Sequence, residues 1–187
     1  MNFLISKKDL PEFVQFSENT PDHLVNPYIK DAWLFDVQPA LLEAEQRTLV
    51  AYTKLDTERK AELASYAELT LEEITLLPAE DQQALKEHQL FEAVRAWFAL
   101  ETYRRLFTYH GFHVTPRGVE FFNEGGQPVP SAQRNEMKQD ILDKRNHYRA
   151  LFEKQLKAYR PLPTTPCGCP PRRTGRQSKG GLQFHAI

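Results

Sequence analysis

The sequence predicts a mainly α protein, a helical bundle around a central apolar helix, with one small β-hairpin and a long C-terminal helix followed by an extended tail. Three observations support this fold class. The most apolar stretch, residues 89–109, repeats its apolar side chains at three- and four-residue intervals, which is typical of a helix. A β-rich segment at 112–122 follows it. A narrower stripe at helical spacing then occupies residues 131–159.

The N-terminal region predicts short helical segments. Ser6 can cap an apolar segment that ends near Phe16. Asn26-Pro27 has the pattern of a cap followed by proline at the first helical position, where a missing N–H costs nothing. We therefore expect a helix from about Pro27 to Val37, and a turn of helix from Pro21 can precede it. Pro39 should end this helix.

Several cap signals divide the next part of the chain. Residues 40–56 should continue as helix, and Asp56 can cap the following stretch. Thr70 and Glu73 fit a capping box, in which each side chain accepts from the backbone N–H of the other. A further helix should begin near Ala79 and run unbroken into the central apolar stretch. Residues 56–88 are rich in Glu and Ala, which indicates a solvated helical elaboration.

The central stretch should form a core helix. Its apolar side chains cover much of the helix circumference, so neighbours should contact it on several sides, with Trp97 and Phe98 in the core. Charged residues interrupt it before the roughly 18 apolar residues that a membrane span needs, so we expect no membrane segment. Gly111 can supply the left-handed cap that ends it.

The predicted hairpin at about 112–122 carries three aromatic side chains on a short element: Phe112, Phe121 and Phe122. A two-stranded hairpin is too small to bury all of them by itself. We predict that they contact a neighbouring subunit, since exposed apolar patches mark interaction sites. The alternative, that they fold back on the domain's own core, is equally open. A loop at 123–130 should lead to Ser131, the cap of the last helix.

The charge distribution divides the chain into two regions. The 187 residues carry a net charge of −1, but residues 160–187 hold five basic side chains and no acidic one, so residues 1–159 carry −6. We predict a helical domain at 1–159 and a basic arm at 160–187, whose five Pro and four Gly indicate extended chain without a core.

The arm offers bidentate guanidinium groups and apolar anchors at the following positions: Arg172, Arg173, Arg176, Leu182, Phe184 and Ile187. We expect it to dock on an adjacent, acidic subunit or a partner. A solvated tail without a partner is the alternative. If the arm docks, a chain that ends at Tyr159 should fold normally yet fail to join an assembly.

No pattern indicates an enzyme, a cofactor or a metal site. His110 and His113 lack a Cys or carboxylate at metal spacing, and Cys167 and Cys169 supply two of the four ligands that a structural zinc site needs. The patterns of phosphate-binding loops, dinucleotide folds, serine hydrolases and zinc proteases do not occur. The first residues lack the apolar region of a signal peptide, so we expect synthesis in a reducing, intracellular site.

The order of these parts resembles a known family. Residues 26–32 and 35–39 cover the predicted helix at 27–37. His110-Gly111 precedes the hairpin and residues 114–119 form its turn, and residues 127–131 lead into the long last helix. Over residues 10–159 this order is similar to the small helical head–tail connector proteins (adaptor or head-completion proteins) of tailed bacteriophages, of the type found in Bacteroidetes phages. Residues 56–88 are longer than the smallest connectors need, and the arm, with Cys167, Cys169 and its arginines, is not part of that pattern.

The resemblance implies a structural virion protein that assembles in the host cytoplasm and acts at the head–tail junction. As a homo-oligomeric ring below the portal protein, it would continue the DNA channel to the tail or to further connector proteins, without sequence-specific DNA binding. Two other classes remain open: a non-specific nucleic-acid-binding accessory protein that uses the basic arm, and a small regulatory helical protein.

Overall fold

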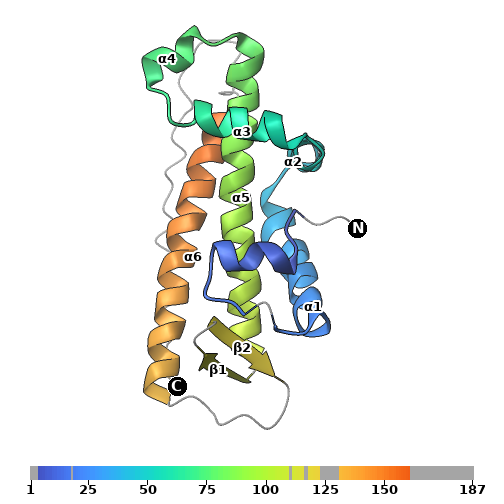
Figure 1. The fold of residues 1–187 in the computed structure, drawn as a ribbon, viewed down its shortest axis with the longest axis vertical. Coiled ribbons are helices and arrows are strands. Elements are labelled where there is room, and N and C mark those ends of the chain that lie inside the picture. The colour runs from blue at the N-terminus through green and yellow to red at the C-terminus, as the bar shows by residue number, and fades with distance from the viewer. Residues whose placement is uncertain (1–3, 18, 110, 116–117, 123–130, 161–187) are drawn as a thin grey trace, which may run out of the picture.

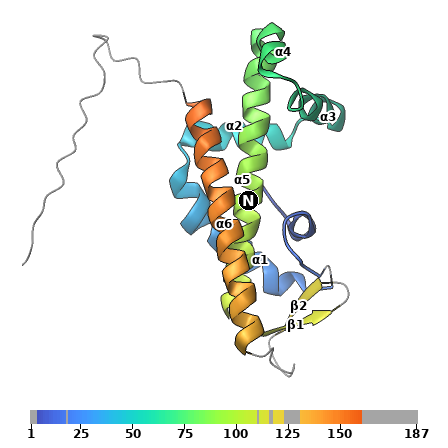
Figure 2. The ribbon, with the colours of Figure 1, turned by 90° about the vertical axis from the view of Figure 1, so that its left-hand side faces the viewer.

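A computed structural model describes residues 4–17, 19–109, 111–115, 118–122 and 131–160. The fold is mainly helical, which confirms the predicted class. Two long helices, α5 (Ala79–Tyr109) and α6 (Ser131–Tyr159), run side by side in opposite directions and give the molecule its elongated shape (Figures 1 and 2). At about 1.5 Å per residue, the 31 residues of α5 span about 46 Å.

The shorter elements precede α5 in the chain, and most of them pack against it. They are η1 (Lys7–Glu12), α1 (Asp22–Ala32), η2 (Trp33–Val37), η3 (Gln38–Ala40), α2 (Glu43–Thr53), α3 (Thr57–Tyr66) and α4 (Leu71–Leu76). Helix α5 contacts η1, α1, η2, α2, α3 and α6. Helix α4 lies beyond them, near the end of the molecule where α5 begins (Figure 1).

Local capping explains where several of these helices begin. The Asp56 carboxylate accepts from the Arg59 N–H at 2.7 Å, which caps α3. The Glu73 carboxylate accepts from the Thr70 N–H at 2.8 Å and completes the capping box of α4. The expected unbroken helix from Ala79 is also confirmed.

The first predicted helix boundary is wrong. Helix α1 begins at Asp22, and Pro27 lies inside it rather than at its first position. A proline there removes one intrahelical hydrogen bond. Leu24 and Val25, in the turn before the proline, are both buried. Their burial against the core offsets that missing bond, a term that local sequence rules do not contain.

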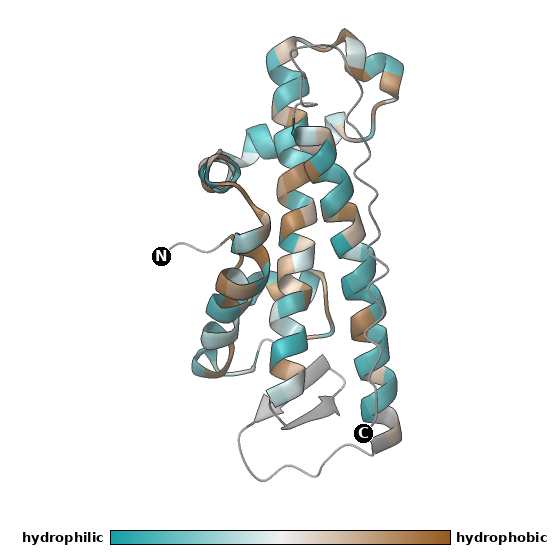
Figure 3. Ribbon diagram, turned by 180° about the vertical axis from the view of Figure 1, so that it is seen from behind, coloured by the Kyte–Doolittle hydropathy of each residue, from teal (hydrophilic) through white to brown (hydrophobic). Residues whose placement is uncertain are grey.

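The core is continuous along α5. Trp97 and Phe98 are buried, as predicted; the Trp97 ring stacks on Phe152 of α6 at 4.8 Å between centroids, and the Phe98 ring lies 5.7 Å from Trp33. Helix α6 contributes a narrow apolar stripe and is otherwise hydrophilic along much of its length (Figure 3). Residues 56–88 are mostly exposed, as expected of a solvated elaboration.

Two strands follow α5. β1 (Gly111–Thr115) and β2 (Gly118–Phe122) pair antiparallel, with Phe112 opposite Phe121. Figure 1 shows them at the end of the molecule opposite α4. The domain therefore has two distinct ends, one formed by α3 and α4 and the other by the strands, with the paired long helices between them.

Candidate functional site

A buried carboxylate joins the two long helices. Glu101 of α5 is fully buried, and its Oε1 accepts from Arg145 Nε of α6 at 2.6 Å and from Trp97 Nε1 at 3.1 Å. Its Oε2 accepts from Arg104 Nε at 2.7 Å. Burial alone would raise the pKa of Glu101, but hydrogen bonds and charges from Arg104 and Arg145 outweigh it and lower the pKa below its usual range.

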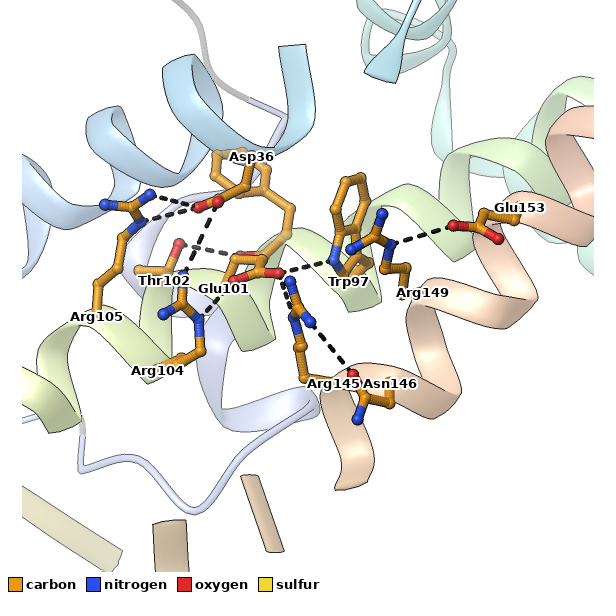
Figure 4. A network of polar contacts seen from close by, with 11 residues as sticks. Asp36, Trp97, Glu101, Thr102, Arg104, Arg105, Arg145, Asn146, Arg149 and Glu153 are labelled. Carbon is orange, nitrogen blue, oxygen red and sulfur yellow. Dashed lines mark hydrogen bonds and ion pairs between the residues drawn. The ribbon is translucent and has the colours of Figure 1, made fainter. Parts of the chain in front are cut away.

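The same network reaches η2 (Figure 4). Asp36 pairs with Arg105 at 2.8 Å, and its other oxygen lies 3.9 Å from Arg104. η2 is a π-helical turn, and it places Asp36 against α5. Two carboxylates and three guanidinium groups thus connect η2, α5 and α6. Buried charges that are fully paired fix the position of helices, whereas a lone one would be costly.

A second cluster holds the N-terminal segment. Arg95 Nη2 pairs with Asp9 and with Glu12 of η1 at 3.0 Å each, and Arg95 Nη1 pairs with Glu92 at 3.3 Å. The Arg95 guanidinium also lies 5.5 Å from the Phe13 ring centroid. Asp9 in turn accepts from the Ser6 N–H, so the predicted cap at Ser6 and the contact with α5 share one carboxylate.

The third cluster is a buried hydrogen bond between two titratable side chains. The Tyr52 hydroxyl of α2 lies 2.6 Å from His88 Nδ1 of α5. Burial lowers the pKa of His88 and raises the pKa of Tyr52, so both side chains favour their neutral forms. With both side chains neutral, this hydrogen bond joins α2 to α5 inside the fold.

Two cavities lie between the described helices, and the larger one borders the second and third clusters. One, of about 720 Å³, lies between α3, α5 and the N-terminal segment, and Thr57, Lys60 and Ala64 of α3 line one wall. The other, of about 260 Å³, lies between α5 and α6 and includes Tyr103 and Met137. Both carboxylates that line the larger cavity, Asp9 and Glu92, pair with Arg95.

A fourth contact fixes the end of α6. Arg160 donates from Nε to Glu45 Oε1 at 2.6 Å and from Nη2 to Oε2 at 2.9 Å, and Oε2 also accepts from the Leu42 N–H at 2.7 Å. Burial works against the charge of Glu45, but these bonds lower its pKa. Arg160 therefore belongs to the folded domain, and the boundary with the arm lies after it. A chain that ends at Tyr159, as in the expectation above, would leave Glu45 buried without its partner.

Most of the predicted interface residues lie outside the described part of the chain. This holds for all six in the arm: Arg172, Arg173, Arg176, Leu182, Phe184 and Ile187. The backbone of Phe112, Phe121 and Phe122 lies in the two strands, and their side chains are outside the description. His110, Cys167 and Cys169 are also outside it.

Sequence reasoning missed the pairing residues that the fold brings together. Glu101 and Arg104 interrupt the apolar stretch, and Asp36 shares a helix face with Ile29, Ala32 and Trp33, which are buried. A charged residue on an otherwise apolar face was the available signal, because such a group must find a partner. No local pattern indicates which partner it finds.

The four most exposed large apolar side chains of the described residues lie near the two ends, whereas two less exposed ones, Leu42 and Leu55, flank α2. Leu71 and Leu76 of α4 are 82% and 84% exposed. Near the other end, Phe35 is 68% exposed over the Arg105 guanidinium, and the exposed Tyr109 stacks on Tyr28. The described helices include none that is long and apolar enough to cross a membrane. Within the described residues, no group of three or more His, Cys, Asp or Glu side chains could hold a metal ion.

Comparison of the chain with protein-family models, with curated proteins and with solved structures finds no match.

Proposed function

We propose that this chain is a head–tail connector protein of a tailed bacteriophage, a structural virion protein that forms a homo-oligomeric ring below the portal and continues the DNA channel to the tail. The observation that carries the proposal is an elongated subunit with apolar side chains exposed near both ends, Leu71 and Leu76 at one and Phe35 and Tyr109 near the other. A protein held between two neighbours along an axis needs contact surfaces at both ends.

The contact between the two long helices supports the same proposal. A subunit that holds two neighbours at a fixed spacing needs its long helices in a fixed register, and the ion pair between buried Glu101 of α5 and Arg145 of α6 joins them in addition to their apolar contacts. Buried ion pairs can fix the register of packed helices. The resemblance of residues 10–159 to connector proteins points to the same class.

In the ring, the bundle formed around α5 packs against adjacent copies. The hairpin at about 112–122 contacts the neighbouring subunit through Phe112, Phe121 and Phe122. The basic arm docks on an adjacent subunit or on the portal protein, while the opposite end meets the tail or a further connector protein. DNA passes through the channel without sequence-specific contacts.

Co-expression of the chain with a portal protein of the same phage tests this function. We expect a ring that co-purifies with the portal and is visible by electron microscopy. The Leu71→Ser/Leu76→Ser variant should remain folded but lose one of the two end contacts, whereas Leu42→Ser, which removes an exposed leucine just before α2, should assemble normally. Cross-linking from position 122 should reach a neighbouring copy.

A monomer that does not associate with portal or particles would contradict the proposal. Strong, salt-dependent DNA binding by the free chain would instead favour a nucleic-acid-binding accessory protein. If cross-links from position 122 stay within one chain, the aromatic side chains of the hairpin belong to the domain's own core, and that part of the interface is wrong.

A further inference from the structure

We propose that in the free subunit the C-terminal segment, residues 161–187, folds back onto the surface formed by α3 and α4 of its own chain. This inference goes beyond the connector function, because it concerns the subunit before any assembly. The segment itself lies outside the described residues. Three features support this placement: the negative charge of the α3–α4 surface, its exposed leucines, and the position of Arg160, after which the segment begins.

The surface is strongly acidic. Residues 56–88 hold nine acidic and three basic side chains, a net charge of −6, which equals the net charge of residues 1–159 as a whole. Glu62 and Asp81 pair with Arg59. Glu58, Glu68, Glu72 and Glu80 are exposed, and the described residues include no ion-pair partner for them.

The same surface is also apolar at α4. The side chains of Leu71 and Leu76 are more exposed than any other large apolar side chain of the described residues. A covering segment that suits this surface must bring apolar side chains and positive charge together. Residues 161–187 supply four basic and no acidic side chains, with Leu182, Phe184 and Ile187 at the end.

Other parts of the protein fit this surface less well. The α3–α4 surface of a second copy carries the same negative charge and would be repelled. Helix α6 carries seven basic and four acidic side chains, but its large apolar side chains face the core. The C-terminal segment combines both properties.

The segment begins beside the surface that it would cover. The Glu45 pair fixes Arg160 at the start of α2, and Figures 1 and 2 both show the end of α6 at the same end of α5 as α3 and α4. The 12 residues from Arg160 to Arg172 span about 20 Å as a flexible chain and about 37 Å as a polyproline helix. Such a tether gives a millimolar effective concentration, so weak contacts suffice for docking within one chain.

Such docking would hide the leucines of α4 until assembly. When a subunit joins its neighbours, the segment would exchange the surface of its own chain for one on the partner. Free subunits would then remain monomers, because an α3–α4 surface that is covered by its own segment cannot bind a neighbour.

Disulfide trapping in the monomeric full chain tests the proposal. The Glu72→Cys/Cys167→Ser variant keeps Cys169 as the reporter in the segment, and the Gln139→Cys/Cys167→Ser variant places the second thiol on exposed α6 as a matched control. After mild oxidation of a mixture of ¹⁴N- and ¹⁵N-labelled protein, peptide mass spectrometry identifies the pairs. We expect about tenfold more bonding to position 72 than to position 139, between peptides of the same label.

Charge provides the second readout. Glu68→Lys/Glu80→Lys in the position-72 variant should reduce trapping severalfold, whereas Glu136→Lys/Asp143→Lys on α6 should not. A salt concentration of 1 M should reduce it as well, because the screening length falls to about 3 Å. Amide exchange in residues 68–80 should be slower in the full chain than in a chain that ends at Arg160.

Equal trapping at positions 72 and 139 would overturn the proposal, as would amide exchange that is unchanged by removal of the segment. Mixed-label pairs at about half of the total, the share that pairing between chains gives in an equimolar mixture, would overturn it as well. None of these measurements involves the portal or the particle, so they fail or succeed independently of the connector function.

Discussion

Arg145 of α6 donates to the fully buried Oε1 of Glu101 in α5 at 2.6 Å, across 44 positions of the sequence. Two arginines on different helices share this carboxylate, and the Trp97 indole donates to it as well. The contact fixes both the distance and the register of the two helices that give the subunit its length.

Glu101→Ala should destabilise the domain by about 3–5 kcal/mol, because it leaves two arginines without the carboxylate that compensates them. Glu153→Ala removes an exposed carboxylate of α6 that pairs with Arg149, and it should cost at most about 1 kcal/mol. Urea unfolding followed by circular dichroism measures both. Equal losses for the two variants would show that the buried network does not hold the helices.

Arg160→Ala should destabilise the domain by about 1–2 kcal/mol at neutral pH, since it removes two hydrogen bonds from buried Glu45. The pKa of Glu45 is lowered in the fold, so this contribution is present above about pH 4.3 and is lost as the pH falls through the folded pKa. The difference between wild type and variant should therefore shrink in acid. A difference that is constant from pH 7 to pH 3 would contradict the assignment.

The Tyr52–His88 pair should make the domain sensitive to mild acid. The pKa of His88 is lowered by burial, so its contribution to stability is present above about pH 6.5 and is lost as the pH falls from there through the lowered folded pKa. Thermal unfolding should show this loss in the wild type as the pH falls below about 6.5. His88→Gln should flatten that part of the profile, whereas His147→Gln, on the exposed face of α6, should leave it unchanged.

Trp97→Ala should cost about 3–5 kcal/mol, because the ring is buried against Phe152. Phe35→Ala, which removes an aromatic ring that is mostly exposed, should cost far less and provides the control. Calorimetric melting temperatures distinguish them. An unchanged melting temperature for Trp97→Ala would mean that α5 is not the centre of the core.

The sequence by itself determined the helical class and most of the element boundaries. Caps such as Asp56 with Arg59 and Thr70 with Glu73 act across three residues, so their signal is complete within a short window. The burial of Trp97 and Phe98 could be predicted for a related reason, since apolar side chains around a whole helix circumference require neighbours on several sides.

Only the tertiary structure decided where the charged residues within those patterns found their partners. Glu101 with Arg145, Asp36 with Arg105 and Glu45 with Arg160 join residues 44, 69 and 115 positions apart. Several arginines could satisfy each buried carboxylate, and the choice depends on which helices the core places side by side. Pro27 lies inside α1 for the same reason: the burial of its neighbours outweighs one missing backbone hydrogen bond, and burial is a property of the whole fold.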